Sequence, residues 1–238
     1  MGQGRGITAW LELSRVSNLP TVWSNALVGV ALASLPGQVP WSRWAVAAAA
    51  CSMLYIGGMI HNDVADAAVD RAERPGRPIP SGRVGRGAAG VAAVLLLLAG
   101  VHLLWFAGPW PVLLAAGLAV MIVAYNLLHR TGAWTVVLLG LCRAMVYVIG
   151  AASVAWPVDM PRVGVWAAVL AAYVIALSLL ARREAGRPQR IKLVVLLICA
   201  ISVLDALILV VLGYRIAAGV AVLCFVAAAW MQRRVIGT

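Results

Sequence analysis

The chain has 238 residues, of which 63% are hydrophobic and 11% are charged, and its mean hydropathy is +0.96. Soluble domains contain about 45–50% apolar and about 25% charged residues, so this composition excludes an ordinary soluble domain and a disordered chain. The net charge of +11 alone would suit a nucleic-acid binder. The basic residues, however, lie between long apolar runs, as they do in the loops of membrane proteins. Nucleic acid is therefore excluded as a partner, and the lipid bilayer is expected.

Apolar runs of about twenty residues recur along the chain, as membrane-spanning helices require. Residues 1–20 hold several charges and predict an interfacial helix that leads into the first span. An outer-membrane barrel is excluded, because its strands alternate apolar and polar residues. We predict an all-α, polytopic membrane bundle of eight spans, at 21–36, 44–61, 88–107, 109–128, 133–156, 163–181, 191–212 and 213–231.

Two hydrophilic segments interrupt these spans. Residues 62–87 follow the second span, and residues 182–192 follow the sixth. Each segment thus follows the second helix of a block of four. This spacing suggests one domain over residues 1–238, built from two pseudo-halves at about 1–130 and 131–238.

The basic residues are distributed unequally between the two sides of the membrane. Fifteen of the 19 Lys and Arg residues fall in segments that share one side, if the N-terminus lies on that side. The positive-inside rule assigns this side to the cytoplasm. We therefore expect a multi-pass protein of the cell membrane with both termini cytoplasmic.

Acidic residues are concentrated at the end of the second span. The chain has eight acids, and four of them, Asp63, Asp66, Asp70 and Glu73, fall within eleven positions. If the helix continues, Asn62, Asp66 and Asp70 follow a spacing of four and share one face, and Asp63 lies in the same arc. Such like charges repel one another near a membrane, so a cation is expected to neutralise them.

Mg²⁺ fits this cluster, because it is held by one or two carboxylates together with phosphate oxygens of a substrate. The next residues, 74–83, supply guanidinium groups suited to a diphosphate. Carboxylates, arginines and a hydrophobic mouth together indicate a lipid diphosphate substrate. The alternative is a solvated loop whose acids only form salt bridges with its own arginines.

The pattern Asn62-Asp63-x-x-Asp66-x-x-x-Asp70, followed by Arg74-Pro75-x-Arg77-Pro78-Ile79-Pro80-Ser81-Gly82, resembles the first aspartate-rich motif of the UbiA superfamily of membrane prenyltransferases. The resemblance extends over most of the chain. Its further matches are Arg15-x-x-Asn18, Asn25, Tyr125 and Gly140-x-x-Arg143.

The resemblance implies a helical bundle around a central cavity and Mg²⁺-dependent transfer of an isoprenyl group from its diphosphate to a small aromatic or polyol acceptor. It also assigns roles to residues. The implied metal ligands are Asn62, Asp63, Asp66, Asp70 and Glu184. The implied diphosphate contacts are Asn62, Arg74, Arg77, Arg182, Arg183 and Asn25. The implied catalytic residues are Asp66, Asp70, Arg143 and Tyr125.

The chain departs from the family pattern after the sixth span. A second aspartate-rich motif is expected there, but Glu184 is the one acid of that segment. Either Glu184 helps to hold a second metal, or Arg182 and Arg183 replace that metal's charge. Divergent EboC-like branches of the superfamily look similar at this point. The family also commonly has nine spans, and eight are expected here.

Two alternatives to the prenyltransferase stay open at this point. One is a terpene cyclase on the same scaffold. The other is a non-catalytic membrane protein, either a transporter or a partner subunit. Arg143 and Asp205 lie within spans and should face the bundle interior, because charges are costly in lipid. Arg143 either lines the cavity or forms a buried ion pair with Asp205.

Overall fold

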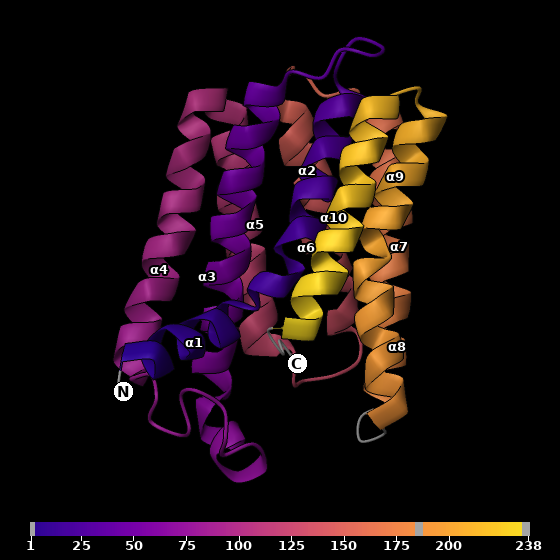
Figure 1. The fold of residues 1–238 in the computed structure, drawn as a ribbon. Coiled ribbons are helices and arrows are strands. Elements are labelled where there is room, and N and C mark those ends of the chain that lie inside the picture. Colours follow the sequence, from indigo (N-terminus) through magenta and orange to yellow (C-terminus); the bar gives the residue numbers. More distant parts are fainter. Residues whose placement is uncertain (1–2, 184–187, 235–238) are drawn as a thin grey trace.

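The computed structural model describes residues 3–183 and 188–234, and within these ranges every regular element is a helix. Figure 1 shows long helices running side by side as a bundle, which confirms the expected all-helical membrane fold. The α-helices are α1 (Gln3–Ser14), α2 (Leu19–Leu32), α3 (Trp41–Glu73), α4 (Arg86–Leu103), α5 (Pro109–Leu128), α6 (Thr135–Ala152), α7 (Met160–Arg183), α8 (Pro188–Cys199), α9 (Ile201–Val211) and α10 (Arg215–Arg234).

Seven segments of the described residues are long and apolar enough to cross a membrane. Each of α3, α5, α6 and α10 supplies one such segment, and α4 supplies another together with the short 3-10 helix that follows it. A further segment is α7, and α8 and α9 make the last one despite an interruption at Ala200. The helix α1 lies across the end of the bundle, as an interfacial helix would, and the C-terminal end of α10 lies at the same end (Figure 1).

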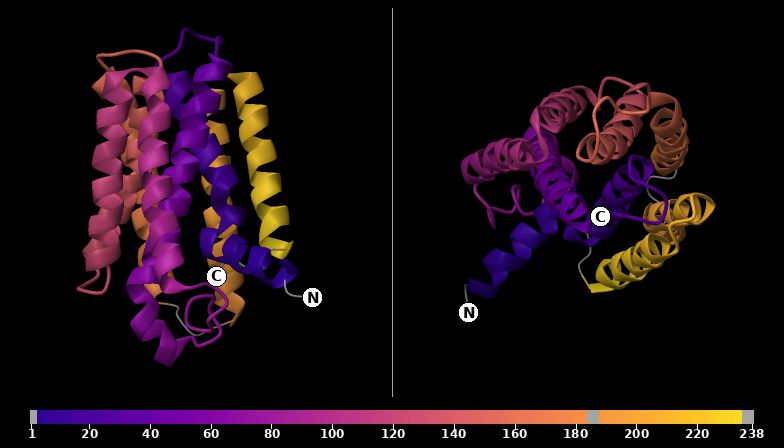
Figure 2. Two further views of the ribbon diagram at one scale, coloured as in Figure 1. Left: turned by 90° about the vertical axis from the view of Figure 1, so that its left-hand side faces the viewer. Right: turned by 90° about the horizontal axis from the view of Figure 1, so that it is seen from above.

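The first expected span, 21–36, is the short helix α2. Its 14 residues rise about 21 Å, at 1.5 Å per residue, so α2 is not among the seven segments that are long enough to cross a membrane, where eight spans were expected. Nearly all of its residues are buried, because α2 packs against α3, α6, α9 and α10 inside the bundle (Figure 2). A helix surrounded by protein can carry polar side chains at a depth where lipid would exclude them. The sequence of α2 uses this freedom at Thr21, Ser24 and Asn25.

Two glycines allow α2 to approach α6 closely. A Cβ atom at Gly29 would collide with the backbone of Tyr147, and one at Gly150 would lie 2.8 Å from the carbonyl oxygen of Ala26. Small residues of this kind let helix backbones come together in membranes. The contact fixes the polar residues of α2 against those of α6.

The helix α3 is 33 residues long and rises about 50 Å. The hydrophilic segment expected at 62–87 is therefore helical through Glu73, and only the remainder, 74–85, is irregular. Ile79 and Val84 anchor this remainder, since both are buried in a cluster with Ala9 and Leu13 of α1. The acidic cluster thus sits on a continuous helix, and the arginine-rich segment after it is packed in place.

Candidate functional site

A cavity of about 710 Å³ opens at the end of the bundle where α1 lies. Its walls come from η1 (Val16–Asn18) and the residue before it, and from α3, α5, α6, α7, α8 and α9. The acidic and amide side chains that line it are Asn18, Asn62, Asp66, Asp70 and Glu73, and the basic ones are Arg15, Arg74, Arg77, His129, Arg130, Arg143 and Arg182. Among the described residues, arginines outnumber carboxylates in this lining, so the cavity favours anionic ligands.

Asn62, Asp66 and Asp70 line the cavity together, as their spacing along α3 predicts. Asp66 lies 3.2 Å from His129 Nε2 and 3.3 Å from Arg130 Nη1. Both partners come from the connection between α5 and α6, so Asp66 ties this connection to α3.

Asp70 accepts a hydrogen bond of 2.6 Å from Arg77 Nη1. The acids therefore do pair in part with an arginine of the segment that follows, as the alternative interpretation expected. Both Asp70 and Arg77 nevertheless line the cavity. The pair places one carboxylate and one guanidinium group at the same wall, which is the combination that a metal-bound diphosphate requires.

Asp63 is placed differently from its neighbours. Its carboxylate is buried, accepts a hydrogen bond of 3.0 Å from Arg15 Nη2, and lies 3.5 Å from Arg77 Nη1. Asp63 does not line the cavity. We had expected it among the metal ligands, but in the structure it instead holds the arginines on either side of it. The helical angle places Asp63 near the acidic face, and the presence of Arg15 decides which way its side chain turns.

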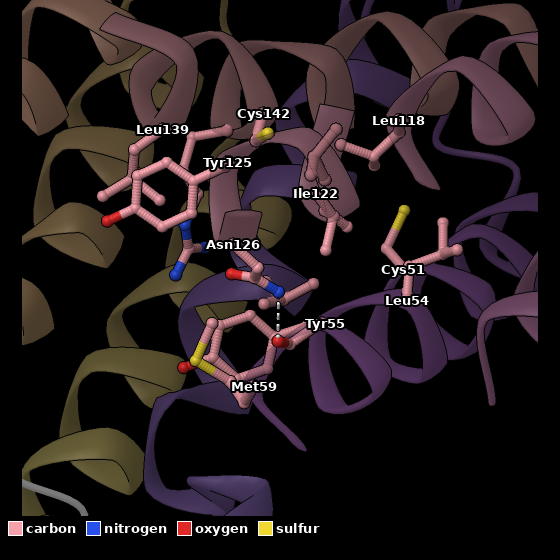
Figure 3. Close-up of a pocket in the computed structure, with 14 residues that line it drawn as sticks. Cys51, Leu54, Tyr55, Met59, Leu118, Ile122, Tyr125, Asn126, Leu139 and Cys142 are labelled. Carbon is pink, nitrogen blue, oxygen red and sulfur yellow. Dashed lines mark hydrogen bonds between the residues drawn. The ribbon is translucent and has the colours of Figure 1, made fainter. Parts of the chain in front are cut away.

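An asparagine on α5 connects the acidic face to the interior. Asn126 Nδ2 donates to the carbonyl oxygen of Gly58 over 2.9 Å and lies 3.1 Å from His61 Nδ1. Its Oδ1 accepts a weaker hydrogen bond of 3.4 Å from Asn62 Nδ2. The bond to Gly58 is the dashed line in Figure 3. Asn126 thereby orients Asn62 toward the cavity.

The expected diphosphate contacts differ in how they are held. Arg74 lines the cavity, and its side chain has no hydrogen-bond or ion-pair partner among the described residues. Arg182 also lines it, but its guanidinium donates to the carbonyl oxygens of His129 and Gly132 and to Thr135 Oγ1. Arg182 therefore clamps the α5–α6 connection onto α7. Glu184 and the side chain of Arg183 lie outside the described residues.

A second, smaller cavity of about 80 Å³ extends into the bundle between α3, α5 and α6 (Figure 3). Its lining is mostly apolar, and includes Val22, Cys51, Leu54, Leu118, Ile122 and Val146. Both cavities share the residues at their junction, which are Tyr55, Met59, Tyr125, Leu139 and Arg143. The polar cavity thus continues into an apolar arm through this junction.

Arg143 lies at the junction, as one of the two interpretations of the sequence predicted. Its Nη1 donates to Asn25 Oδ1 over 2.9 Å, its Nη2 donates to Thr21 Oγ1 over 3.1 Å, and its guanidinium lies 5.6 Å from the centre of the Tyr55 ring. Arg143 and Asp205 form no direct ion pair. Asn25 stands between them, with its Nδ2 donating to Asp205 Oδ2 over 2.8 Å.

Asn25 is not a diphosphate contact in this structure. Its side chain is wholly buried, both of its polar atoms are bonded to protein, and it lines neither cavity. Any effect of Asn25 on a ligand must pass through Arg143. Tyr125, in contrast, lines both cavities where the sequence placed it.

The cavity wall supplies oxygen atoms that could bind a metal, but not a complete set of protein ligands. Among the described residues, no group of three or more His, Cys, Asp or Glu side chains is arranged to hold a metal ion. Mg²⁺ rarely uses such a cage and usually binds through one or two carboxylates, water and substrate phosphates. The row of Asn62, Asp66 and Asp70 fits that mode of binding.

Sequence reasoning missed several residues of the site. The sequence assigns no role from their chemistry to five residues that line one or both of the cavities, which are Arg15, Tyr55, Asn126, His129 and Arg130. One signal was available for two of them, because His129 and Arg130 end a span on the same side as the acids. The others are brought to the cavity only by helix packing.

The chain is similar to known proteins in sequence and in fold. The model of the UbiA prenyltransferase family matches residues 22–237. A digeranylgeranylglyceryl phosphate synthase from Ignicoccus hospitalis is 37% identical over 127 residues, which are 53% of this chain and 41% of that protein. The enzyme of the same name from Methanoregula boonei is 29% identical over 152 residues, or 63% of this chain and 53% of that protein. The matched segments thus span less than two thirds of these relatives.

The fold has a solved counterpart. A structure from work on the biosynthesis of digeranylgeranylglyceryl phosphate synthase in membranes superposes with a TM-score of 0.65. It covers 96% of this chain and 88% of its own, at 18% sequence identity. At that identity the likeness concerns the arrangement of helices.

Proposed function

The chain belongs to the UbiA prenyltransferase family, and on that premise we propose that it transfers an isoprenyl group from an isoprenyl diphosphate to the hydroxyl group of a polyol phosphate in the membrane. The observation that carries this proposal is the amphipathic cavity. Asn62, Asp66 and Asp70 face an arginine-rich chamber, which continues into an apolar arm.

The polar chamber suits the diphosphate. In the reaction, the bond between the allylic carbon of the donor and the diphosphate oxygen breaks, and that carbon forms a bond with the acceptor oxygen. The acceptor's hydroxyl proton is released together with diphosphate. Negative charge grows on the leaving group, and Arg74, Arg77 and Arg130 at the cavity wall stabilise it.

Asn62, Asp66 and Asp70 would hold Mg²⁺, with Asp63 keeping Arg15 and Arg77 in position beside them. When bound, the metal neutralises charge on the diphosphate. In that state the carboxylates of Asp66 and Asp70 would face the metal, and their present partners Arg77 and Arg130 would be free to contact the phosphate oxygens. Before the donor arrives, these arginines compensate the charges of Asp66 and Asp70.

The apolar arm suits the hydrocarbon part of the donor and excludes water from the reacting carbon. Tyr55 and Tyr125 line the junction between the chamber and the arm. Their rings stabilise positive charge that develops on the allylic fragment, since the face of an aromatic ring attracts cations.

The acceptor is the finer part of the proposal. The relatives' name denotes a glyceryl phosphate that bears two geranylgeranyl groups. A protein that completes this product takes geranylgeranyl diphosphate and a glyceryl phosphate that already bears one such group. The excess of arginines over carboxylates in the described lining supports an acceptor that carries its own negative charge in addition to the diphosphate. A neutral aromatic acceptor would leave this excess without a use.

The direction of the protein in the membrane follows from its charges. The cavity opens at the end that carries α1 and the arginine-rich segment 74–85. We place this end and both termini in the cytoplasm, by the positive-inside rule.

The experiment that tests this function uses the purified full chain in detergent. Geranylgeranyl diphosphate, Mg²⁺ and geranylgeranylglyceryl phosphate are incubated with the wild type, with Asp66→Asn and with Asp159→Asn as a control. Asp159 is an exposed acid in the connection between α6 and α7, and it lines neither of the two cavities. The doubly prenylated product should form with the wild type and with the control, and not with Asp66→Asn. A cyclic hydrocarbon formed without acceptor would instead identify a terpene cyclase, and no consumption of donor would identify a non-catalytic protein.

A further inference from the structure

Buried polar side chains from three helices meet behind the junction of the two cavities. Asp205 of α9 is wholly buried, and its two carboxylate oxygens have different partners. Tyr147 of α6 donates to Oδ1 over 2.5 Å, and Asn25 of α2 donates to Oδ2 over 2.8 Å. None of these three residues lines a cavity. They therefore cannot touch a substrate in either cavity.

A carboxylate at this depth is costly unless its charge is compensated. The compensation reaches Asp205 in an indirect way. Asn25 donates to Asp205 with its Nδ2 and accepts from Arg143 Nη1 with its Oδ1, over 2.9 Å. The Asn25 amide can bridge Asp205 and Arg143 in only one orientation, because its nitrogen donates and its oxygen accepts. The negative charge therefore fixes the amide, and the amide fixes the guanidinium.

Arg143 keeps hydrogen-bonding capacity after these contacts. A guanidinium group has five N–H donors. Two of the donors of Arg143 are bonded, one to Asn25 Oδ1 and one to Thr21 Oγ1. The others have no partner among the described residues, and they lie at the junction beside Tyr55 and Tyr125. Unused donors of a cation in a bundle interior require an oxygen acceptor.

The level of this site along α3 separates it from the acidic row. The guanidinium lies over Tyr55, which precedes Asn62 by seven residues, or about 10 Å of helix. A diphosphate held at the level of Asn62, Asp66 and Asp70 therefore lies nearer the mouth than Arg143 does. Oxygen atoms of a second substrate can therefore reach Arg143 from the cavity without displacing the diphosphate.

We infer that Asp205 is a positioning residue that acts through Asn25 on Arg143, and that Arg143 so held binds oxygen atoms of the polar head of the acceptor. The inference rests on the proposed function for the identity of the reaction. It adds a site for the acceptor that is distinct from the diphosphate site. The relay itself, Asp205–Asn25–Arg143, is independent of which acceptor is used.

The test compares Asp205→Asn, Arg143→Gln, the double variant and Ser202→Ala. Ser202 is the matched control, because it is also wholly buried on α9 and its hydroxyl lies 2.9 Å from Ser24 Oγ of α2. Removing that bond weakens the same helix contact and leaves the hydrogen bonds of Asn25 to Asp205 and to Arg143 in place. Four quantities are measured for each variant: the melting temperature without ligand, the affinity for geranylgeranyl thiodiphosphate with Mg²⁺, and the acceptor KM and kcat.

Asp205→Asn should raise the acceptor KM about tenfold, as expected for a lost bond to a charged group. It should leave the affinity for the thiodiphosphate within about twofold. In the Arg143→Gln background, Asp205→Asn should change the acceptor KM by less than about twofold, because the relay has already lost its end. Ser202→Ala should lower the melting temperature and leave the acceptor KM unchanged.

Two results would overturn the inference. One is an Asp205→Asn variant that behaves like Ser202→Ala, with a lower melting temperature and an unchanged acceptor KM. The other is additivity, in which the losses of melting temperature in Asp205→Asn and Arg143→Gln without ligand simply sum in the double variant. A wild type that neither binds the thiodiphosphate nor turns over would overturn the proposed function instead. The ligand-free comparison still decides the relay in that case.

Discussion

The acids of α3 and Asp205 of α9 are both buried carboxylates in a membrane bundle, and they are neutralised in different ways. Asp66 and Asp70 touch cationic side chains directly, and both line the cavity. Asp205 touches neutral donors, is sealed from both cavities, and reaches a cation only through the amide of Asn25.

This difference separates ligand binding from scaffolding. A direct ion pair at a cavity wall can be exchanged, since a bound cation would take the place of the arginine and a phosphate would take the place of the carboxylate. A carboxylate enclosed by hydrogen bonds has no such exchange available, and it can only hold its surroundings in one arrangement. The comparison therefore supports the two proposed roles, which are metal and diphosphate binding for the acids of α3 and positioning of Arg143 for Asp205.

The largest effect on ligand binding is expected from a substitution of an acid of α3 that lines the cavity. Asp70→Asn removes the charge that faces Arg77 and the cavity. We expect Mg²⁺-dependent binding of an isoprenyl thiodiphosphate to fall by about a hundredfold, because changing even the partners of metal ligands commonly costs about 10- to 100-fold. The measurement is the melting temperature in detergent against thiodiphosphate concentration, with and without Mg²⁺.

Asp63→Asn is the control for this prediction, since Asp63 lies on the same helix, is also buried, and does not line the cavity. It should lower the melting temperature, because Arg15 loses its carboxylate partner. It should keep the Mg²⁺ dependence of the shift. Equal loss of Mg²⁺ dependence in Asp63→Asn and Asp70→Asn would contradict the division between metal ligand and supporting acid.

The next effect breaks the scaffold on which Asp205 depends. Gly29→Ala places a Cβ atom against the backbone of Tyr147, one helical turn from Asn25. Because neither backbone can yield easily, we expect a loss of about 1–3 kcal/mol in the free energy of unfolding. Thermal or denaturant unfolding in detergent measures it. Gly117→Ala is the control, since nothing lies within 4 Å of a Cβ at that position. Equal stability of the two variants would mean that α2 and α6 are not in close contact.

The acidic face of α3 could be predicted from the sequence because its information is local. A spacing of four along one helix is enough to align Asn62, Asp66 and Asp70, and the helix that was assumed does continue to Glu73. Arg74 and Arg77 come one and four residues after Glu73, the last residue of α3, and both line the cavity. The same local reasoning failed for Asp63, because the helical angle cannot show that Arg15 lies on that side.

The group around Asp205 could not be predicted, because its members are far apart in the sequence. Asn25 and Arg143 are separated by 118 positions, and Asn25 and Asp205 by 180. The cost of charge in lipid predicts only that Arg143 and Asp205 face the interior. It does not predict that Asn25 stands between them. That arrangement follows from the close packing of α2 and α6, which Gly29 and Gly150 permit.

A smaller effect concerns the clamp that positions the partners of Asp66. Arg182→Gln removes the guanidinium that bonds to His129 O, Gly132 O and Thr135 Oγ1. The connection that carries His129 and Arg130 is then less well held, and we expect the affinity for the thiodiphosphate to fall about tenfold. Arg71→Gln, which removes an exposed charge on α3 that lines neither cavity, is the control. If both variants lose the same affinity, Arg182 contributes only net charge.

The smallest effect concerns an ion pair that is direct but exposed. Arg83 Nη1 lies 2.9 Å from Glu12 Oε2, with both side chains 35% exposed, and it joins the segment after α3 to α1. Exposed ion pairs contribute about 0–1 kcal/mol to stability. Glu12→Gln should therefore lower the free energy of unfolding by at most about 1 kcal/mol and leave thiodiphosphate binding unchanged. Such a result would mean that a direct ion pair affects ligand binding only where it is buried at the cavity wall. A loss of thiodiphosphate binding in Glu12→Gln would show that α1 and the segment 74–85 control the site through this bond, and the distinction between the two kinds of buried acid would have to include it.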